Sequence, residues 1–168
     1  MSYTVWMDGT KIGETALEMR HGARKRAGVF HPTELGLSVL PGITAMGPAL
    51  LDTGRMCREL GINTEDAALD VEAAADELFG TPPGQRVLAA ASQIARLELR
   101  GPTGELVRWD SILISDVDEM AAAAARDSGT KLEVDTPPNT ERMRYLISAT
   151  LAKGAAGRSF WSRAPALS

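Results

Sequence analysis

Apolar and charged residues alternate most regularly in the run Ala95–Arg100, where every second residue is apolar. Successive side chains of a β-strand point to opposite faces, so this pattern predicts a strand with one buried face and one face in water. The sequence Gly101-Pro102-Thr103-Gly104 follows and predicts a turn. A second, more apolar strand is then expected over Leu106–Ser115.

Another hairpin is predicted at the start of the chain, where Tyr3–Met7 and Lys11–Met19 flank Asp8-Gly9. Asp-Gly tolerates the positive φ angles of a tight hairpin turn. We therefore expect an α+β fold in which two hairpins form one small antiparallel sheet of about four strands. Several helices are expected to pack against this sheet.

Helices are predicted from apolar residues spaced three and four apart and from residues that commonly cap helix ends. The expected N-caps are Thr33, Asn63, Asp116 and Asn139, and Pro41-Gly42 is expected to break the first helix. The approximate ranges are 34–40, 48–60, 64–79, 82–93, 117–129 and 140–153.

The length of 168 residues fits a single domain, which we expect to span residues 1–153. Residues 154–168 are rich in Gly, Ala and Ser and are expected to form a flexible C-terminal tail. Cys57 is the sole cysteine, so no internal disulfide is expected, and its apolar helical neighbours predict a buried thiol. Without a secretory signal pattern at the N-terminus, a soluble cytoplasmic protein is expected.

The run Leu35–Leu51 contains no charged residue and, at 17 residues, reaches the lower limit for crossing a bilayer. Pro41 and Pro48 interrupt it, and a lipid-exposed helix could not easily satisfy the backbone groups around two prolines. The run is therefore interpreted as buried helices, and no membrane span is expected.

Charge is distributed unevenly along the chain, whose net charge is −4. A basic segment supplies the candidates for binding an anion or a partner: Arg20, His21, Arg24, Lys25 and Arg26. An acidic segment lies in a stretch without Lys or Arg from Gly61 to Gln85, and its candidate partner-binding residues are Asp66, Asp70 and Glu77. The acidic net charge argues against nucleic acid as the main partner.

Arg20-His21-Gly22 followed by Arg24 resembles the Arg-His-Gly-x-Arg motif of the histidine phosphatase superfamily. The resemblance implies a phosphoryl-accepting histidine at His21 with arginines that bind the phosphoryl oxygens. That chemistry also needs a second histidine far downstream, and no histidine follows His31. A solvated basic loop between a strand and a helix is the favoured interpretation.

Ile112–Asp118 resembles the first motif of the haloacid dehalogenase superfamily, in which an apolar strand leads to two aspartates two residues apart. The resemblance implies that Asp116 and Asp118 serve phosphoryl transfer at Mg²⁺. That family continues with Gly-Thr, where this chain has Glu119-Met120. The favoured interpretation is that Asp116 caps a helix.

One cysteine and two histidines cannot supply the four ligands of a structural zinc site, and no phosphate-binding glycine loop or Gly-x-Ser-x-Gly motif occurs. No catalytic residue, metal or cofactor is therefore predicted. We expect a non-enzymatic interaction or accessory domain that binds a protein partner or a copy of itself. Two alternatives stay open: a phosphoryl-transfer enzyme using the Arg20-His21-Gly22 segment, and a protein that binds phosphate or nucleic acid through the basic segment.

Overall fold

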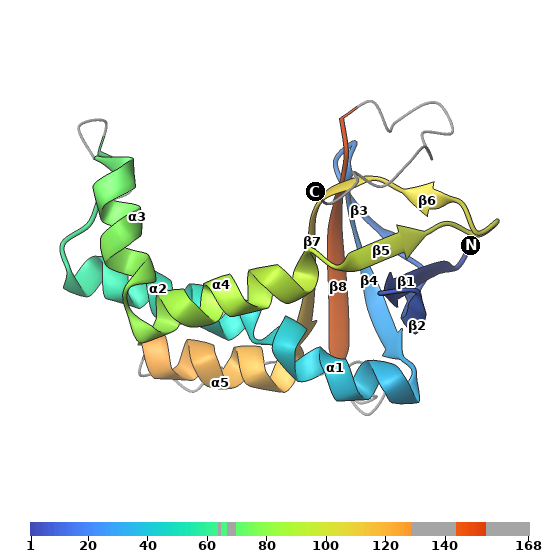
Figure 1. Cartoon of the computed structure of the whole chain (residues 1–168), viewed down its shortest axis with the longest axis horizontal. Helices are drawn as coiled ribbons and strands as arrows, with labels where there is room; N and C mark the ends of the chain where they lie inside the picture. The colour runs from blue at the N-terminus through green and yellow to red at the C-terminus, as the bar shows by residue number, and fades with distance from the viewer. Residues whose placement is uncertain (64, 67–69, 129–143, 154–168) are drawn as a thin grey trace.

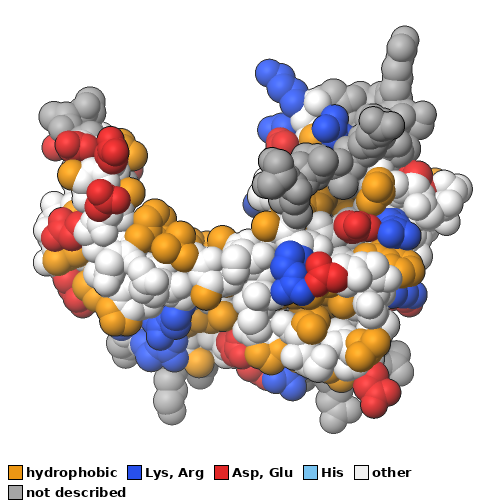
Figure 2. Space-filling model, viewed as in Figure 1, with side chains coloured by type: hydrophobic (Ala, Val, Ile, Leu, Met, Phe, Trp, Pro, Cys, Tyr) orange, Lys and Arg blue, Asp and Glu red, His pale blue; other side chains and the backbone are white. Residues whose placement is uncertain are grey.

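The computed structural model describes residues 1–63, 65–66, 70–128 and 144–153. Strands curve around a core at one end of the molecule, and helices extend away from them as an arm (Figure 1). The N-terminus lies in the part of the molecule that the strands form. Together the two parts give the molecule a U shape, which is hollow between the tip of the arm and the top of the strands (Figure 2).

The sheet has eight strands, and all of its pairings are antiparallel. Its order is β6-β5-β1-β2-β4-β8-β7, with β3 paired to β4. Only Arg108 separates the two end strands β6 and β7 in the sequence, so the sheet curves round until it is nearly closed into a barrel. The strands are β1 (Tyr3–Met7), β2 (Thr10–Thr15), β3 (Met19–His21), β4 (Lys25–Pro32), β5 (Leu97–Arg100), β6 (Leu106–Val107), β7 (Trp109–Asp116) and β8 (Tyr145–Leu151).

The predicted α+β class is confirmed, but the sheet is larger than the expected four strands. The strand predicted over Leu106–Ser115 is divided into β6 and β7, which lie at opposite ends of the strand order. The helix predicted over 140–153 is wrong where the structure describes it, because Tyr145–Leu151 is strand β8. Its Tyr, Ile and Thr residues favour a strand, and pairing on both sides with β4 and β7 satisfies its backbone.

The helices are α1 (Glu34–Thr44), α2 (Met46–Glu59), α3 (Val71–Phe79), α4 (Pro82–Ile94) and α5 (Val117–Ser128). Thr33 caps α1 as predicted, because its Oγ1 accepts a hydrogen bond of 3.0 Å from the backbone N of Gly36. The expected break at Pro41-Gly42 is wrong, since α1 continues to Thr44. Proline removes one backbone donor, but its fixed φ is compatible with a helix. Continuing the helix past Pro41 also buries Ile43 in the core.

Asp70, and not Asn63, caps α3, because Asp70 Oδ1 accepts from the backbone N of Ala73 at 3.1 Å. Asn63 instead accepts from the backbone N of Glu65 at 3.0 Å, in the segment before the helix. The predicted helix over 64–79 is therefore shorter than expected at its start, and residues 64 and 67–69 lie outside the described residues. The predicted tail, 154–168, also lies outside them.

The core fills the curved sheet and continues into the helices that cover it. Its fully buried side chains include Val5, Phe30, Ile43, Leu99 and Ile114. Helix α1 lies unusually close to β2, because a Cβ on Gly36 would meet the carbonyl oxygen of Ile12 at 1.9 Å. Helix α1 thereby closes one opening of the barrel, and α2, α4 and α5 pack together beyond it.

One described helical stretch, Glu34–Glu59, is long and apolar enough to cross a membrane by length and composition. A third of its most apolar window is buried inside the molecule, and the core helix of a soluble protein passes the same test.

Candidate functional site

The basic segment forms a β-hairpin, not the loop between a strand and a helix that the sequence suggested. Strands β3 and β4 are joined by a turn in which Gly22 has a φ of 80°. Arg20 pairs directly with Arg26, and His21 pairs directly with Lys25. Directly opposed residues share a face of the hairpin, so each face carries two basic side chains.

These basic residues differ in their contacts within the chain. Arg24 forms an ion pair of 2.7 Å with Asp110 and donates to the carbonyl oxygen of Leu151 at 3.2 Å. Arg26 donates to carbonyl oxygens of the hairpin itself. The side chains of Arg20, His21 and Lys25 are exposed and form no ion pair or hydrogen bond with another described residue. Like charges placed opposite each other destabilise a hairpin, so an external anion would relieve the cross-strand repulsion.

The acidic segment ends in α3, which forms the tip of the helical arm (Figure 1). None of its residues is buried, and Val71 is 70% exposed. Asp70 is occupied as the N-cap, and Asp66 lies in the segment before the helix. The exposed acids Glu72, Asp76 and Glu77 form no ion pair with a described residue.

The acidic helix and the basic hairpin lie on opposite arms of the U (Figure 2). Acidic side chains cover the tip that α3 forms, and Lys and Arg side chains gather above the ends of β3 and β4. Helix α3 packs against α2 and α4, whereas β3 pairs with β4. The acidic surface and the basic surface are therefore separate from each other and both exposed to solvent.

The arrangement around His21 does not form a phosphate pocket like the one implied by the Arg20-His21-Gly22 motif. His21 is exposed, and its neighbour Arg20 projects from the opposite face of the same strand. Arg24 lies in the turn and is held by Asp110. No group of three or more His, Cys, Asp or Glu side chains that could hold a metal occurs among the described residues.

Asp116 lies where β7 ends and α5 begins, and its carboxylate is fully engaged. Oδ1 accepts from the backbone N of Asp118 at 3.0 Å and of Glu119 at 3.4 Å, as the predicted helix cap requires. Oδ2 accepts from Arg144 Nε at 3.1 Å, and this hydrogen bond raises the pKa of Arg144. Asp116 is only 3% exposed and has a structural role.

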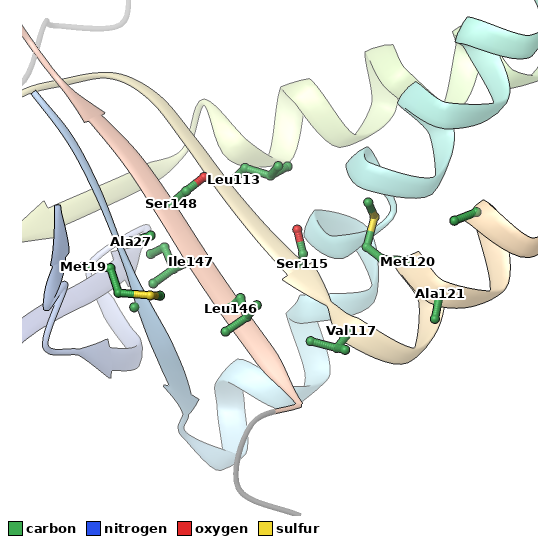
Figure 3. Close-up of a pocket in the computed structure, with 12 residues that line it drawn as sticks. Met19, Ala27, Leu113, Ser115, Val117, Met120, Ala121, Leu146, Ile147 and Ser148 are labelled. Carbon is green, nitrogen blue, oxygen red and sulfur yellow. The ribbon is translucent and has the colours of Figure 1, made fainter. Parts of the chain in front are cut away.

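Two structural features, a buried charge cluster and an apolar pocket, were not predicted from the sequence. Asp52 is buried between α2, α4 and α5, and three arginines approach it: Arg86 at 2.9 Å, Arg55 at 3.4 Å and Arg126 at 3.9 Å. An apolar pocket of about 470 Å³ lies between the outer face of the sheet and α5 (Figure 3). Only the spacing of Asp52 and Arg55 within one helix was visible in the sequence.

The prediction of a buried Cys57 is wrong, because its side chain is half-buried on α2. The helical segment that carries it lies at the surface of the arm, where its neighbours Arg58 and Glu59 are exposed.

No family model, no curated protein and no solved structure matches this chain.

Proposed function

We propose that this protein is a non-enzymatic interaction domain that pairs with a second copy of itself through surfaces of opposite charge. The basic surface consists of Arg20, His21 and Lys25 on the β3–β4 hairpin. The acidic surface consists of Glu72, Asp76 and Glu77 on α3. The observation that carries the proposal is the position of these two surfaces on opposite arms, each without ion-pair partners among the described residues.

Two copies related by a twofold axis could join the acidic helix of each copy to the basic hairpin of the other. Such an interface is self-complementary and closes after two copies, because each contact occurs twice. Electrostatic complementarity of this kind speeds association and fixes the orientation of the partners. A phosphoryl-transfer role receives less support, since Arg20 and His21 project from opposite faces of β3.

The experiment is sedimentation velocity of the whole chain at increasing salt. Exposed charges are screened over about 10 Å at 0.1 M salt and about 3 Å at 1 M. We expect a dimer at low salt that dissociates at high salt. The double variant R20E/K25E should be monomeric at low salt, because the arginine and the lysine of the basic surface are both replaced by acids.

The control is K11E/R108E, which also exchanges two bases for acids but lies away from the hairpin: Lys11 is half-buried and pairs with Glu14, and Arg108 is exposed. Two reversals of −2 each take the net charge from −4 to −8 in both double variants. A control that dissociates as completely as R20E/K25E would show that net repulsion, and not the hairpin, governs association. A wild type that is monomeric at every salt concentration would contradict the proposal.

A further inference from the structure

The apolar pocket lies on the outward face of strands β3, β4, β8 and β7, where rows of side chains can be traced from the strand register. Residues that are directly opposite in antiparallel strands share a face. The central row runs across all four strands and contains only apolar or small side chains: Met19, Ala27, Ser148 and Leu113. The row beyond it, towards the start of β8, contains Val29, Leu146 and Ser115.

Helix α5 supplies the opposite wall of the pocket, as Figure 3 shows for Val117, Met120 and Ala121. Among the described residues that line the pocket, Ser115 and Ser148 carry the only polar side chains, and the others are apolar or glycine. Its volume of about 470 Å³ lies within the usual range for small-molecule sites. The lining offers no charge and few hydrogen bonds, so it suits the apolar body of a ligand.

The next row on the same face has a different character. It contains His21, Lys25, Thr150 and Ser111, which are all polar or basic. Rows on one face are two residues apart, or about 6.7 Å. Lys25 and His21 therefore lie one row from Ala27 and Met19, and neither side chain forms a hydrogen bond or ion pair with another described residue.

This order of rows matches an amphiphile with one apolar chain and one anionic head. From the row of Val29 and Leu146 to the row of Lys25 is about 13 Å, a length that an extended decanoate chain can fill. Burial of the chain of such a molecule would supply affinity, while Lys25 and His21 would attract its carboxylate. Thr150 lies beside Lys25 and presents a hydroxyl group on the same face.

We propose that the pocket between α5 and the outer face of β3, β4, β8 and β7 binds a single fatty acid. The chain lies over Ala27, Leu113 and Leu146, and the carboxylate lies beside Lys25 and His21. This inference goes beyond the self-association proposed above. It shares Lys25 and His21 with the basic surface, but its apolar lining belongs to neither charged surface.

The test is isothermal titration calorimetry of the whole chain with monomeric octanoate, decanoate and decanol. Affinity for the carboxylates should rise up to about fourfold for each added methylene, as burial of the chain predicts. K25Q should lower the affinity for decanoate about threefold and leave the affinity for decanol unchanged. K11Q, which removes a half-buried lysine that pairs with Glu14 on β2, should leave both affinities unchanged.

A27F places a ring in the central row and should reduce decanoate affinity at least tenfold, with an unchanged unfolding midpoint showing an intact fold. If A27F does not fold, the comparison of octanoate with decanoate and the effect of K25Q still test the proposal. Wild type that binds none of these probes, or A27F that binds decanoate normally, would overturn the proposal. Binding to anionic phospholipid vesicles without binding to monomeric decanoate would also overturn it, in favour of a membrane surface.

The experiments can contradict the fatty acid site without contradicting self-association, and the reverse. Loss of decanoate binding in A27F with an unchanged sedimentation profile would support the fatty acid site whether or not the chain dimerises. R20E should affect self-association but not decanol binding, because Arg20 faces away from the pocket.

Discussion

Asp116 is the residue with the clearest structural role, because it joins a strand, a helix and a distant arginine. Its carboxylate satisfies two backbone donors at the start of α5 and the Nε of Arg144. The neighbouring Asp118 lies in the first turn of the same helix and is exposed. The two aspartates of one sequence motif therefore differ in what they stabilise.

Replacing Asp116 with alanine should lower the free energy of unfolding by about 1–3 kcal/mol, since it removes a cap and leaves backbone donors without partners. D118A removes only a favourable charge near the helix N-terminus and should cost about 0.5 kcal/mol. Urea unfolding followed by circular dichroism measures both. Equal losses in the two variants would show that the cap contributes little.

At the scale of elements, the position of α1 depends on a close contact between backbones. A Cβ on Gly36 would lie 1.9 Å from the carbonyl oxygen of Ile12, which cannot move without disturbing β2. Gly42 lies later in the same helix, where a Cβ would meet only Gln93 Cγ at 3.6 Å. The two glycines provide a matched pair.

We expect G36A to lower the free energy of unfolding by about 2 kcal/mol or more, because α1 must move away from the barrel. G42A should raise it by up to about 1 kcal/mol, because alanine is the better helix former. Thermal and urea unfolding of the two variants give the comparison. A G36A protein as stable as wild type would show that α1 is not held at the distance described here.

Local signals allowed some elements to be predicted from the sequence. The β1–β2 turn was predicted from Asp8-Gly9, which has φ angles of 49° and 79°. The strand β5 was predicted from its alternation, and Thr33 from its capping preference. Strand β8 was missed because Leu146, Ile147, Thr150 and Leu151 also fit helical spacing, and only its pairing with β4 and β7 determines that it is a strand.

Some of the candidate sites could likewise be predicted from local sequence, and others could not. The basic and acidic segments could be found from composition alone, although their placement on opposite arms could not. The apolar pocket depends on how the β3–β4 hairpin pairs with β8 and β7, which lie far from it in the sequence. A shift of one residue in this register would move every side chain of a strand to the other face. No sequence pattern indicated that Lys25 and Ala27 share the face of β4 on which the pocket lies.

At the scale of the whole molecule, the acidic surface and the basic surface lie at separate ends of the U. Within one chain the acidic helix and the basic hairpin are held apart by the arm of α2, α4 and α5. Asp52 helps to fix that arm, because arginines from all three helices approach its buried carboxylate. In the proposed dimer, this separation would let each surface meet its counterpart on the other copy.

The most direct test mixes two variants that each carry a single sign of charge on both arms. R20E/K25E has acidic residues on both surfaces, and D76K/E77K has basic residues on both. Each variant alone should sediment as a monomer at low salt, because like charges then meet at both contacts. An equimolar mixture should form a heterodimer that dissociates at high salt. Two variants that remain monomeric when mixed, or that each dimerise alone as well as wild type, would contradict the pairing of these surfaces.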